Sequence, residues 1–246
     1  MFENSSDIAA VILGAGKGTR MQSDLPKVMM PVCGKPMIQH ILDTLKEMKV
    51  TKVVTVISKE GELVKNQVSP LPTAVQEEQL GTGHAVMCTR KFLEKFNGPV
   101  LVIFGDTPLI TAKTFTKIAD TIKKGFHVVV LGFKTDKPAR YGRLKMNGEV
   151  LTEIVEYKDA TEEERKINFC NSGCMGFDGR ILFDLLDKIG NENAANEYYL
   201  TDVVKIARAQ NMKCTAIEGD IREIASANTR EELAELENAY KDKENW

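Results

Sequence analysis

Two patterns of hydrophobic and polar residues alternate along the first half of the chain. Short, almost continuously apolar runs predict strands buried on both faces, at Ile8–Leu13, Lys52–Ile57, Val100–Phe104 and His127–Phe133. Longer segments with apolar residues at helical spacing predict helices at Pro36–Lys49 and Ala112–Lys124. Such strand–helix alternation predicts an α/β fold with a sheet of parallel strands.

The pattern changes after Lys134. Two strand-like segments, Arg143–Met146 and Val150–Tyr157, flank Asn147–Gly148, a dipeptide typical of a hairpin turn. A charged stretch that follows predicts a short exposed helix. The remaining elements that we expect are a strand, two helices, a strand and a charged terminal helix, at Phe169–Phe177, Arg180–Lys188, Thr201–Ala209, Lys213–Glu218 and Arg230–Lys243.

Composition narrows the possible classes of protein. The chain has 246 residues, 43% of them apolar, and a net charge of −2, so we expect a packed core and no nucleic-acid partner. The N-terminus lacks the features of a signal peptide, and no apolar run approaches the roughly 20 residues of a membrane span. Five cysteines without a CxxC motif indicate reduced thiols in a cytoplasm, and scattered histidines do not favour a zinc site.

A glycine-rich loop, ILGAGKGTRM, follows the first predicted strand. It is neither a P-loop, which needs GxxxxGK[ST], nor a dinucleotide fingerprint, because Thr19 stands where the third glycine belongs. Extended to Lys27, the pattern GAGKGTRMxxxxPK resembles the signature of the sugar-1-phosphate nucleotidylyltransferases. The alternative is a tight turn with two solvated cations.

The resemblance implies a reaction between phosphates, in which a sugar phosphate oxygen attacks the α-phosphorus of a nucleoside triphosphate and pyrophosphate leaves. Backbone N–H groups of the loop, from Leu13, Gly14, Ala15 and Gly16, are then expected to bind the nucleotide. We expect Arg20 to stabilise the pyrophosphate and Lys27 to hold the substrate phosphates, as catalytic residues.

The segment QLGTGHA, Gln79 to Ala85, resembles the uracil-contacting segment of the UTP:N-acetylglucosamine-1-phosphate uridylyltransferases. A Gln79 amide offers a donor and an acceptor to one edge of a base, and Gly81 leaves room for a flat ring. The resemblance therefore implies nucleotide contacts at Gln79, Gly81 and Thr82. Taken alone, the segment could be an ordinary turn.

The motif FGDTPL places Asp106 at the carboxyl end of a predicted strand, where open α/β sheets bind ligands. A carboxylate there could hold Mg²⁺ against the triphosphate, or it could cap a turn before Pro108. In the family the second ligand of the metal is an asparagine before the terminal helix, and Asn228 matches it. Alternatively, Asn228 is the N-cap of that helix.

Four further segments resemble the sugar side of the same family: YGR, IVEYKDAT, NSG and EYYLTD. The resemblance implies that residues within them bind the N-acetylated sugar, namely Gly142, Glu156, Asn171 and Tyr199. A carboxylate and a carboxamide supply the acceptors and donors that sugar hydroxyls need.

The resemblance covers the chain from Ile8 to about Asn238. It implies a Rossmann-like three-layer α/β sandwich with a mostly parallel mixed sheet and a smaller sugar-binding excursion that contains the β-hairpin. The expected domain spans residues 1–229, with the excursion at about 140–200 and a terminal helix at 230–246. Phe104 stands where a tyrosine is frequent, and Gly14 where an alanine is usual.

The implied activity is Mg²⁺-assisted transfer of a uridylyl group from UTP to N-acetylglucosamine 1-phosphate. Alternatives are another sugar 1-phosphate, such as N-acetylgalactosamine 1-phosphate, or a non-catalytic nucleotide-sugar sensor on the same fold. The hexapeptide-repeat half of the family's bifunctional members is missing, so we expect neither acetyl transfer nor a trimer of that type.

Overall fold

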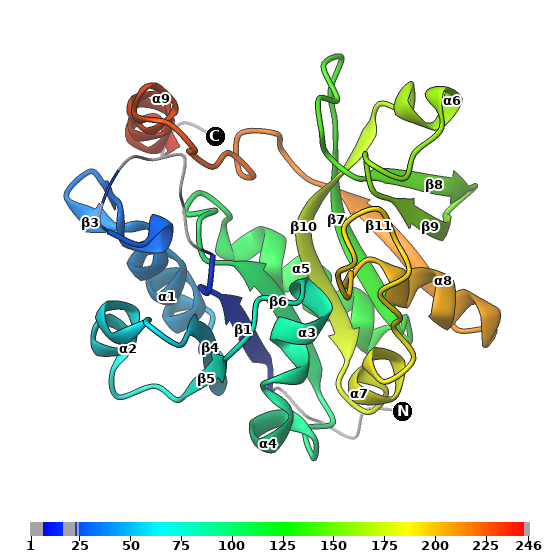
Figure 1. The fold of residues 1–246 in the computed structure, drawn as a ribbon, viewed down its shortest axis with the longest axis horizontal. Coiled ribbons are helices and arrows are strands. Elements are labelled where there is room, and N and C mark those ends of the chain that lie inside the picture. The colour runs from blue at the N-terminus through cyan, green and yellow to red at the C-terminus, as the bar shows by residue number, and fades with distance from the viewer. Residues whose placement is uncertain (1–6, 17–22, 24, 244–246) are drawn as a thin grey trace.

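The core of the molecule is a twisted sheet with helices on both faces, seen in a computed structural model that describes residues 7–16, 23 and 25–243 (Figure 1). Within these residues nine strands join one sheet, whose main path runs β11-β7-β10-β6-β1-β4-β5. In sequence order these strands are β1 Ala9–Leu13, β4 Lys52–Ser58, β5 Thr73–Gln76, β6 Pro99–Phe104, β7 Val128–Lys134, β10 Phe169–Asp178 and β11 Cys214–Glu218. All pairs on this path are parallel except those of β10.

Helices and short segments complete the fold. The helices are α1 Met37–Glu47, α2 Glu62–Val68, α3 Thr82–Met87, α4 Arg90–Leu93, α5 Ala112–Lys123, α6 Glu162–Arg165, α7 Leu182–Leu186, α8 Asp202–Ala209 and α9 Arg230–Lys241. A 3-10 helix spans Lys27–Met29, and a small second sheet pairs β2 Pro31–Val32 with β3 Lys35–Pro36. None of the helices within the described ranges is long and apolar enough to cross a membrane.

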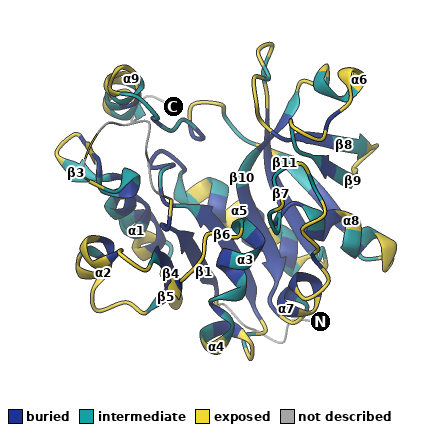
Figure 2. Cartoon of the chain, viewed as in Figure 1, coloured by how far each residue is buried: buried dark blue, intermediate teal, exposed yellow. Residues whose placement is uncertain are grey.

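Alternating side chains of the central strands build two separate cores, one on each face of the sheet. The strands themselves are buried and are dark blue in Figure 2. Along β1, Ala9, Val11 and Leu13 face the core shared with α3, α7 and α8. Ala10 and Ile12 face the core shared with α1, α2 and α5. The chain is therefore a three-layer α/β sandwich, and the expected fold class is confirmed.

The hairpin of β8 Arg143–Asn147 and β9 Val150–Val155 leaves the main sheet beside β10. Gly148 adopts a positive φ of 59° in its turn, as the Asn-Gly pair predicts. Lys134 at the end of β7 pairs directly with Phe169 at the start of β10. The segment between these two residues thus leaves and rejoins the sheet at one place.

Seven elements were not expected from the sequence: the 3-10 helix, β2, β3, α2, β5, α3 and α4. Each is only two to seven residues long, too short for a clear hydrophobic period. At the other end of the chain, α9 packs through Leu236 into a small cluster with Val32 and Met37. This contact brings the terminal helix next to the segment that carries Lys27.

Candidate active site

A cavity of about 310 Å³ opens where the carboxyl ends of β1 and β6 meet. Its lining includes eight of the residues predicted to bind nucleotide or phosphate: Leu13, Ala15, Gly16, Lys27, Gln79, Gly81, Thr82 and Asp106. Gly14 lies just behind the lining, where its N–H donates to Val56 O at 2.8 Å. Arg20 lies outside the described residues.

Lys27 joins the two predicted metal ligands. Its Nζ contacts Asp106 Oδ2 as an ion pair and donates to Asn228 Oδ1 at 2.8 Å. Both side chains of the ion pair are mostly buried, so solvent screens their attraction less than on a surface. The turn after β6 is closed by Thr107, which donates to Phe104 O through its backbone and its hydroxyl. The Asp106 carboxylate instead faces Lys27.

Asn228 is not the N-cap of the last helix, because Thr229 has that role and accepts from Glu232 N at 3.2 Å. The Asn228 backbone N–H and side-chain amide both donate to Glu232 Oε2, at 2.6 and 3.2 Å. Its amide nitrogen therefore faces Glu232 while its oxygen faces Lys27.

The two predicted metal ligands fit a magnesium ion. Asp106 Oδ2 and Asn228 Oδ1 contact the same ammonium group, so both oxygens can reach one cation. Mg²⁺ prefers oxygen ligands, takes one or two from the protein and completes its shell with phosphate and water. No cluster of three or more His, Cys, Asp or Glu suited to a metal occurs among the described residues.

Two glutamines line the same cavity. Gln79 Nε2 donates to Ala15 O and so ties its segment to the glycine-rich loop. Gln76, at the end of β5, is buried and donates to Gly81 O at 3.0 Å. Gln76 was not predicted from the sequence, although the QLGTGHA motif begins only three residues later. The only sign of an inward-facing Gln76 is the alternation of buried and exposed residues along β5, which is four residues long.

Gly81 lines the first cavity and is also held against another part of the chain. It adopts a φ of +112°, and a Cβ there would lie 2.7 Å from Tyr198 O. Its missing side chain thus makes room for the backbone of Tyr198. Tyr198 N donates to Leu80 O, Gly83 N donates to Tyr198 O, and Leu200 N donates to Thr82 Oγ1. These bonds hold the QLGTGHA and EYYLTD segments together.

A second cavity, of about 230 Å³, contains three of the predicted sugar-binding residues, Glu156, Asn171 and Tyr199. A Cβ at Gly142 would lie 3.4 Å from Glu156 Oε1 and 3.5 Å from Asn171 Cβ, so Gly142 adjoins the same place. Both cavities are lined by Thr82, Phe104 and Glu197. The predicted nucleotide and sugar residues therefore occupy adjoining spaces.

Phe104 forms part of the wall between these spaces. A Cβ at Gly173 would lie 2.1 Å from Phe104 Cε2, and Gly173 has a φ of +86°. The ring of Phe104 can therefore lie directly against the backbone of β10.

Glu156 is a half-buried carboxylate with a hydroxyl partner. Burial raises its pKa above the ordinary value, whereas a hydrogen bond of 3.1 Å from Thr201 Oγ1 to Oε1 lowers it. Nearby Asp159, Asp202 and Glu197 raise it further. Burial and the same acidic neighbours raise the pKa of Tyr199 to about 12, so its hydroxyl stays protonated at neutral pH. This cavity thus offers an acceptor and a donor to a sugar.

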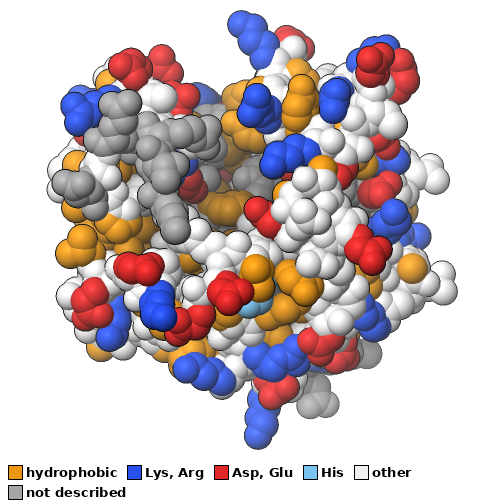
Figure 3. All heavy atoms as spheres, viewed as in Figure 1, with side chains coloured by type: hydrophobic (Ala, Val, Ile, Leu, Met, Phe, Trp, Pro, Cys, Tyr) orange, Lys and Arg blue, Asp and Glu red, His pale blue; other side chains and the backbone are white. Residues whose placement is uncertain are grey.

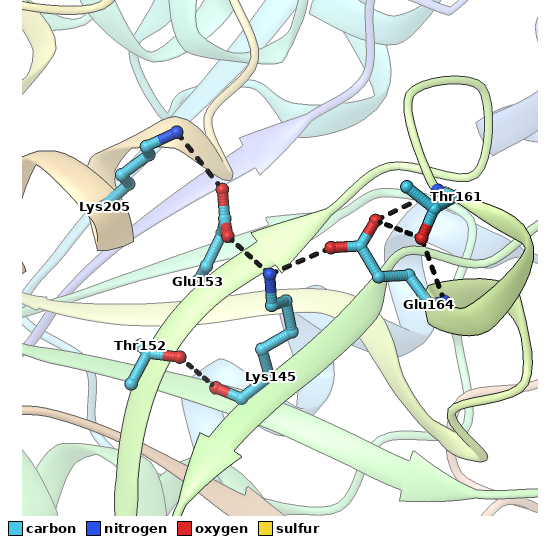
Figure 4. Close-up of polar contacts among 6 residues, drawn as sticks. All are labelled: Lys145, Thr152, Glu153, Thr161, Glu164 and Lys205. Atoms are coloured by element: carbon cyan, nitrogen blue, oxygen red, sulfur yellow. Dashed lines mark hydrogen bonds and ion pairs between the residues drawn. The ribbon is translucent and has the colours of Figure 1, made fainter.

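A network of ion pairs links β8, β9, α6 and α8 (Figure 4). Lys145 of β8 binds Glu153 of β9 at 3.0 Å and Glu164 of α6 at 2.8 Å, and Lys205 of α8 also binds Glu153. Thr161 and Glu164 form a capping box at the start of α6. The hydrogen bond from Lys145 is the main cause that lowers the pKa of Glu164 to about 2.

The family model of the MobA-like NTP transferase domain matches residues 10–174. The chain belongs to this family. A nucleotidyltransferase was expected from the loop motif, and this enzyme class is confirmed. The matched part of this NTP transferase carries Lys27, Asp106 and most of the predicted sugar side, while Tyr199 and Asn228 lie beyond it.

Curated relatives agree with this assignment. The chain is 47% identical to the bifunctional protein GlmU of Paramagnetospirillum magneticum, over 95% of this chain and 52% of that protein. It is 48% identical to the protein of the same name from Rhodospirillum rubrum, over 93% of this chain and 52% of that protein. The chain thus spans about half the length of these relatives.

A solved structure confirms the fold. A chain from Bacillus anthracis, named as a glucose-1-phosphate thymidylyltransferase in complex with a sucrose, superposes with a TM-score of 0.74. The alignment covers 96% of both chains at 20% sequence identity. The NTP transferase therefore shares the three-layer architecture of that protein.

Proposed function

We propose that this NTP transferase joins UTP and N-acetylglucosamine 1-phosphate to give UDP-N-acetylglucosamine and pyrophosphate, with Mg²⁺ as cofactor. The observation that carries the proposal is the convergence of Lys27, Asp106 and Asn228 at a cavity that adjoins the Glu156 and Asn171 pocket. The resemblance of the motifs to uridylyltransferases and the names of the curated relatives support the choice of substrates.

The chemistry is an in-line exchange at phosphorus. An oxygen of the sugar phosphate forms a bond to the α-phosphorus of the triphosphate, and the bond to the bridging α–β oxygen breaks as pyrophosphate leaves. Most of the catalysis comes from positioning and from neutralisation of charge. The reaction needs no covalent intermediate on the protein.

The described residues divide this work between them. The N–H groups of Ala15 and Gly16 and the amides of Gln76 and Gln79 surround the space for the nucleoside. Lys27 brings a positive charge to the phosphates. Asp106 and Asn228 would hold Mg²⁺, which supplies charge neutralisation at the triphosphate when bound. Glu156 and Asn171 would orient the sugar, with its phosphate turned toward Lys27.

Two further expectations from the sequence extend the proposal. Arg20 would stabilise the leaving pyrophosphate, as the resemblance to the family implies. All five cysteines are free in the structure, which supports a cytoplasmic location. Charged side chains of both signs are interspersed on the face in Figure 3, which agrees with small-molecule substrates in place of nucleic acid.

Pyrophosphate release tests the proposal, measured with UTP and a panel that includes N-acetylglucosamine 1-phosphate and N-acetylgalactosamine 1-phosphate. We expect fastest turnover with the first sugar phosphate and dependence on added Mg²⁺. Asp106→Asn should lower kcat by about 100-fold or more, while Asp184→Asn, a matched change on an exposed face of α7, should not. Tight UDP-sugar binding without turnover for any pair would instead indicate a sensor.

A further inference from the structure

The carboxylate of Glu232 is the partner that orients Asn228. Its Oε2 atom accepts from the Asn228 backbone N–H at 2.6 Å and from the Asn228 side-chain amide at 3.2 Å. One oxygen thus fixes both the main chain and the side chain of the same residue. We propose that Glu232 is a positioning residue that aims Asn228 Oδ1 at the metal site, an inference that rests on the proposed function.

This contact departs from an ordinary helix start. Glu232 occupies the third position of α9, from which a glutamate usually reaches back to the N–H of the capping residue. Here the cap is Thr229, and Glu232 reaches one residue further back, to Asn228. The first turn of α9 is therefore coupled to the residue that faces Lys27 and Asp106.

Electrostatics allow only one orientation of the Asn228 amide. With its nitrogen toward Glu232, its oxygen lies 2.8 Å from the Lys27 ammonium. The reversed amide would place an oxygen against the Glu232 carboxylate and an NH₂ group against the ammonium, two repulsive contacts. A cation at the position of the ammonium would favour the same orientation. Glu232 therefore sets the amide for metal binding before a metal arrives.

Removing a residue that hydrogen-bonds to a metal ligand typically weakens metal affinity by about 10–100-fold. We therefore expect Glu232→Ala to weaken binding of Mn²⁺, a spectroscopic probe for Mg²⁺, by about 10–100-fold. Glu232→Gln keeps an acceptor oxygen at the same reach and should restore most of the affinity. The measurement is the electron paramagnetic resonance signal of free Mn²⁺, titrated with the full chain in the presence of UTP.

Two controls separate positioning from helix stability. Glu231→Ala removes an equal charge from the same turn at an exposed residue. Thr229→Ala removes the cap, at a cost of about 1 kcal/mol, without touching the bonds of Asn228. Both should stay within about twofold of the unchanged protein in Mn²⁺ affinity. Circular dichroism checks the fold, and Glu232→Asp, with a carboxylate one methylene shorter, replaces Glu232→Ala if that variant unfolds.

The possible outcomes are distinct. If Glu232→Ala binds Mn²⁺ no more weakly than Glu231→Ala or Thr229→Ala, while Asp106→Ala loses binding, the role of Glu232 is refuted and the proposed metal site stands. If Asp106→Ala also binds Mn²⁺ normally, or the unchanged chain binds none, both the metal site and the inference are wrong. Weak binding in Glu232→Ala that Glu232→Gln restores supports the inference.

Discussion

Replacing Thr201 by valine tests whether its hydroxyl controls the charge of Glu156. Thr201 precedes α8, yet its side chain makes no capping bond and donates instead to Glu156 Oε1 at 3.1 Å. Valine has nearly the same shape but cannot donate. The half-buried carboxylate then loses a hydrogen bond that favours its ionised form.

The size of the effect follows from the kind of bond. A hydrogen bond to a charged group contributes about 1.5–3 kcal/mol. Thr201→Val should therefore raise the pKa of Glu156 further, because the hydroxyl of Thr201 favours the ionised carboxylate. At pH 8, where Glu156 is ionised in the unfolded chain, the variant should lose about 1.5–3 kcal/mol of unfolding free energy.

The sign of the pH dependence is fixed by the direction of the shift. Because the folded-state pKa of Glu156 lies above the ordinary value of 4.5, the folded protein binds more protons than the unfolded chain in that interval. Stability therefore falls as pH rises from 4.5 through the folded-state pKa. The fall should be larger in Thr201→Val, and the difference between the two proteins should shrink to about 1 kcal/mol or less at pH 4.

Urea unfolding at pH 4 and pH 8 measures this difference. Thr215→Val is the matched control, because Thr215 is also buried but donates to a neutral carbonyl, Glu149 O, at 2.8 Å. Its cost should be independent of pH. A loss in Thr201→Val that is equal at both pH values, as in the control, would refute the reasoning. In the enzyme assay, the KM for the sugar phosphate should rise as pH is lowered. This rise should begin at a higher pH in Thr201→Val than in the unchanged protein.

Two further changes test how the loops around the cavities are held. Gly81→Ala should raise the KM values for both substrates and lower the unfolding free energy by about 1–3 kcal/mol, because a Cβ there meets the Tyr198 backbone. The control is Gly190→Ala, which places a Cβ in open space and should change neither the KM values nor the unfolding free energy. Arg143→Met should lower the unfolding free energy measured in urea by about 3 kcal/mol, since this fully buried guanidinium donates to three backbone carbonyls. A loss of unfolding free energy below about 1 kcal/mol would contradict that structural role.

The sequence predicted the parts of the molecule that depend on local pattern. The apolar runs of β1, β4, β6 and β7 and the Asn-Gly turn of the hairpin lie where they were expected, because period and turn chemistry are local properties. The antiparallel pairing of β10 makes the sheet mixed. The hydrophobic pattern alone predicted parallel strands, and only the family resemblance implied a mixed sheet.

The candidate site likewise has residues that the sequence predicted and contacts that it did not. Motif order placed Lys27, Asp106 and Asn228 as candidates, and the structure brings all three together. The contacts of Glu232, Thr201 and Tyr198 could not be predicted, since each joins residues through a fold that no local pattern describes. Gln76 was missed because β5 is too short to show its alternation.

The direct pairing of Lys134 with Phe169 has a practical consequence. A chain segment whose two ends are neighbours can be exchanged for one of another length without stretching the strands that flank it. The hairpin, α6 and Glu156 all lie within this segment, whereas Lys27, Asp106 and Asn228 lie outside it. Grafting the equivalent segment from a relative with another acceptor would thus replace Glu156 and the hairpin beside it, while Asn171, Tyr199 and the phosphate-binding residues stay in place.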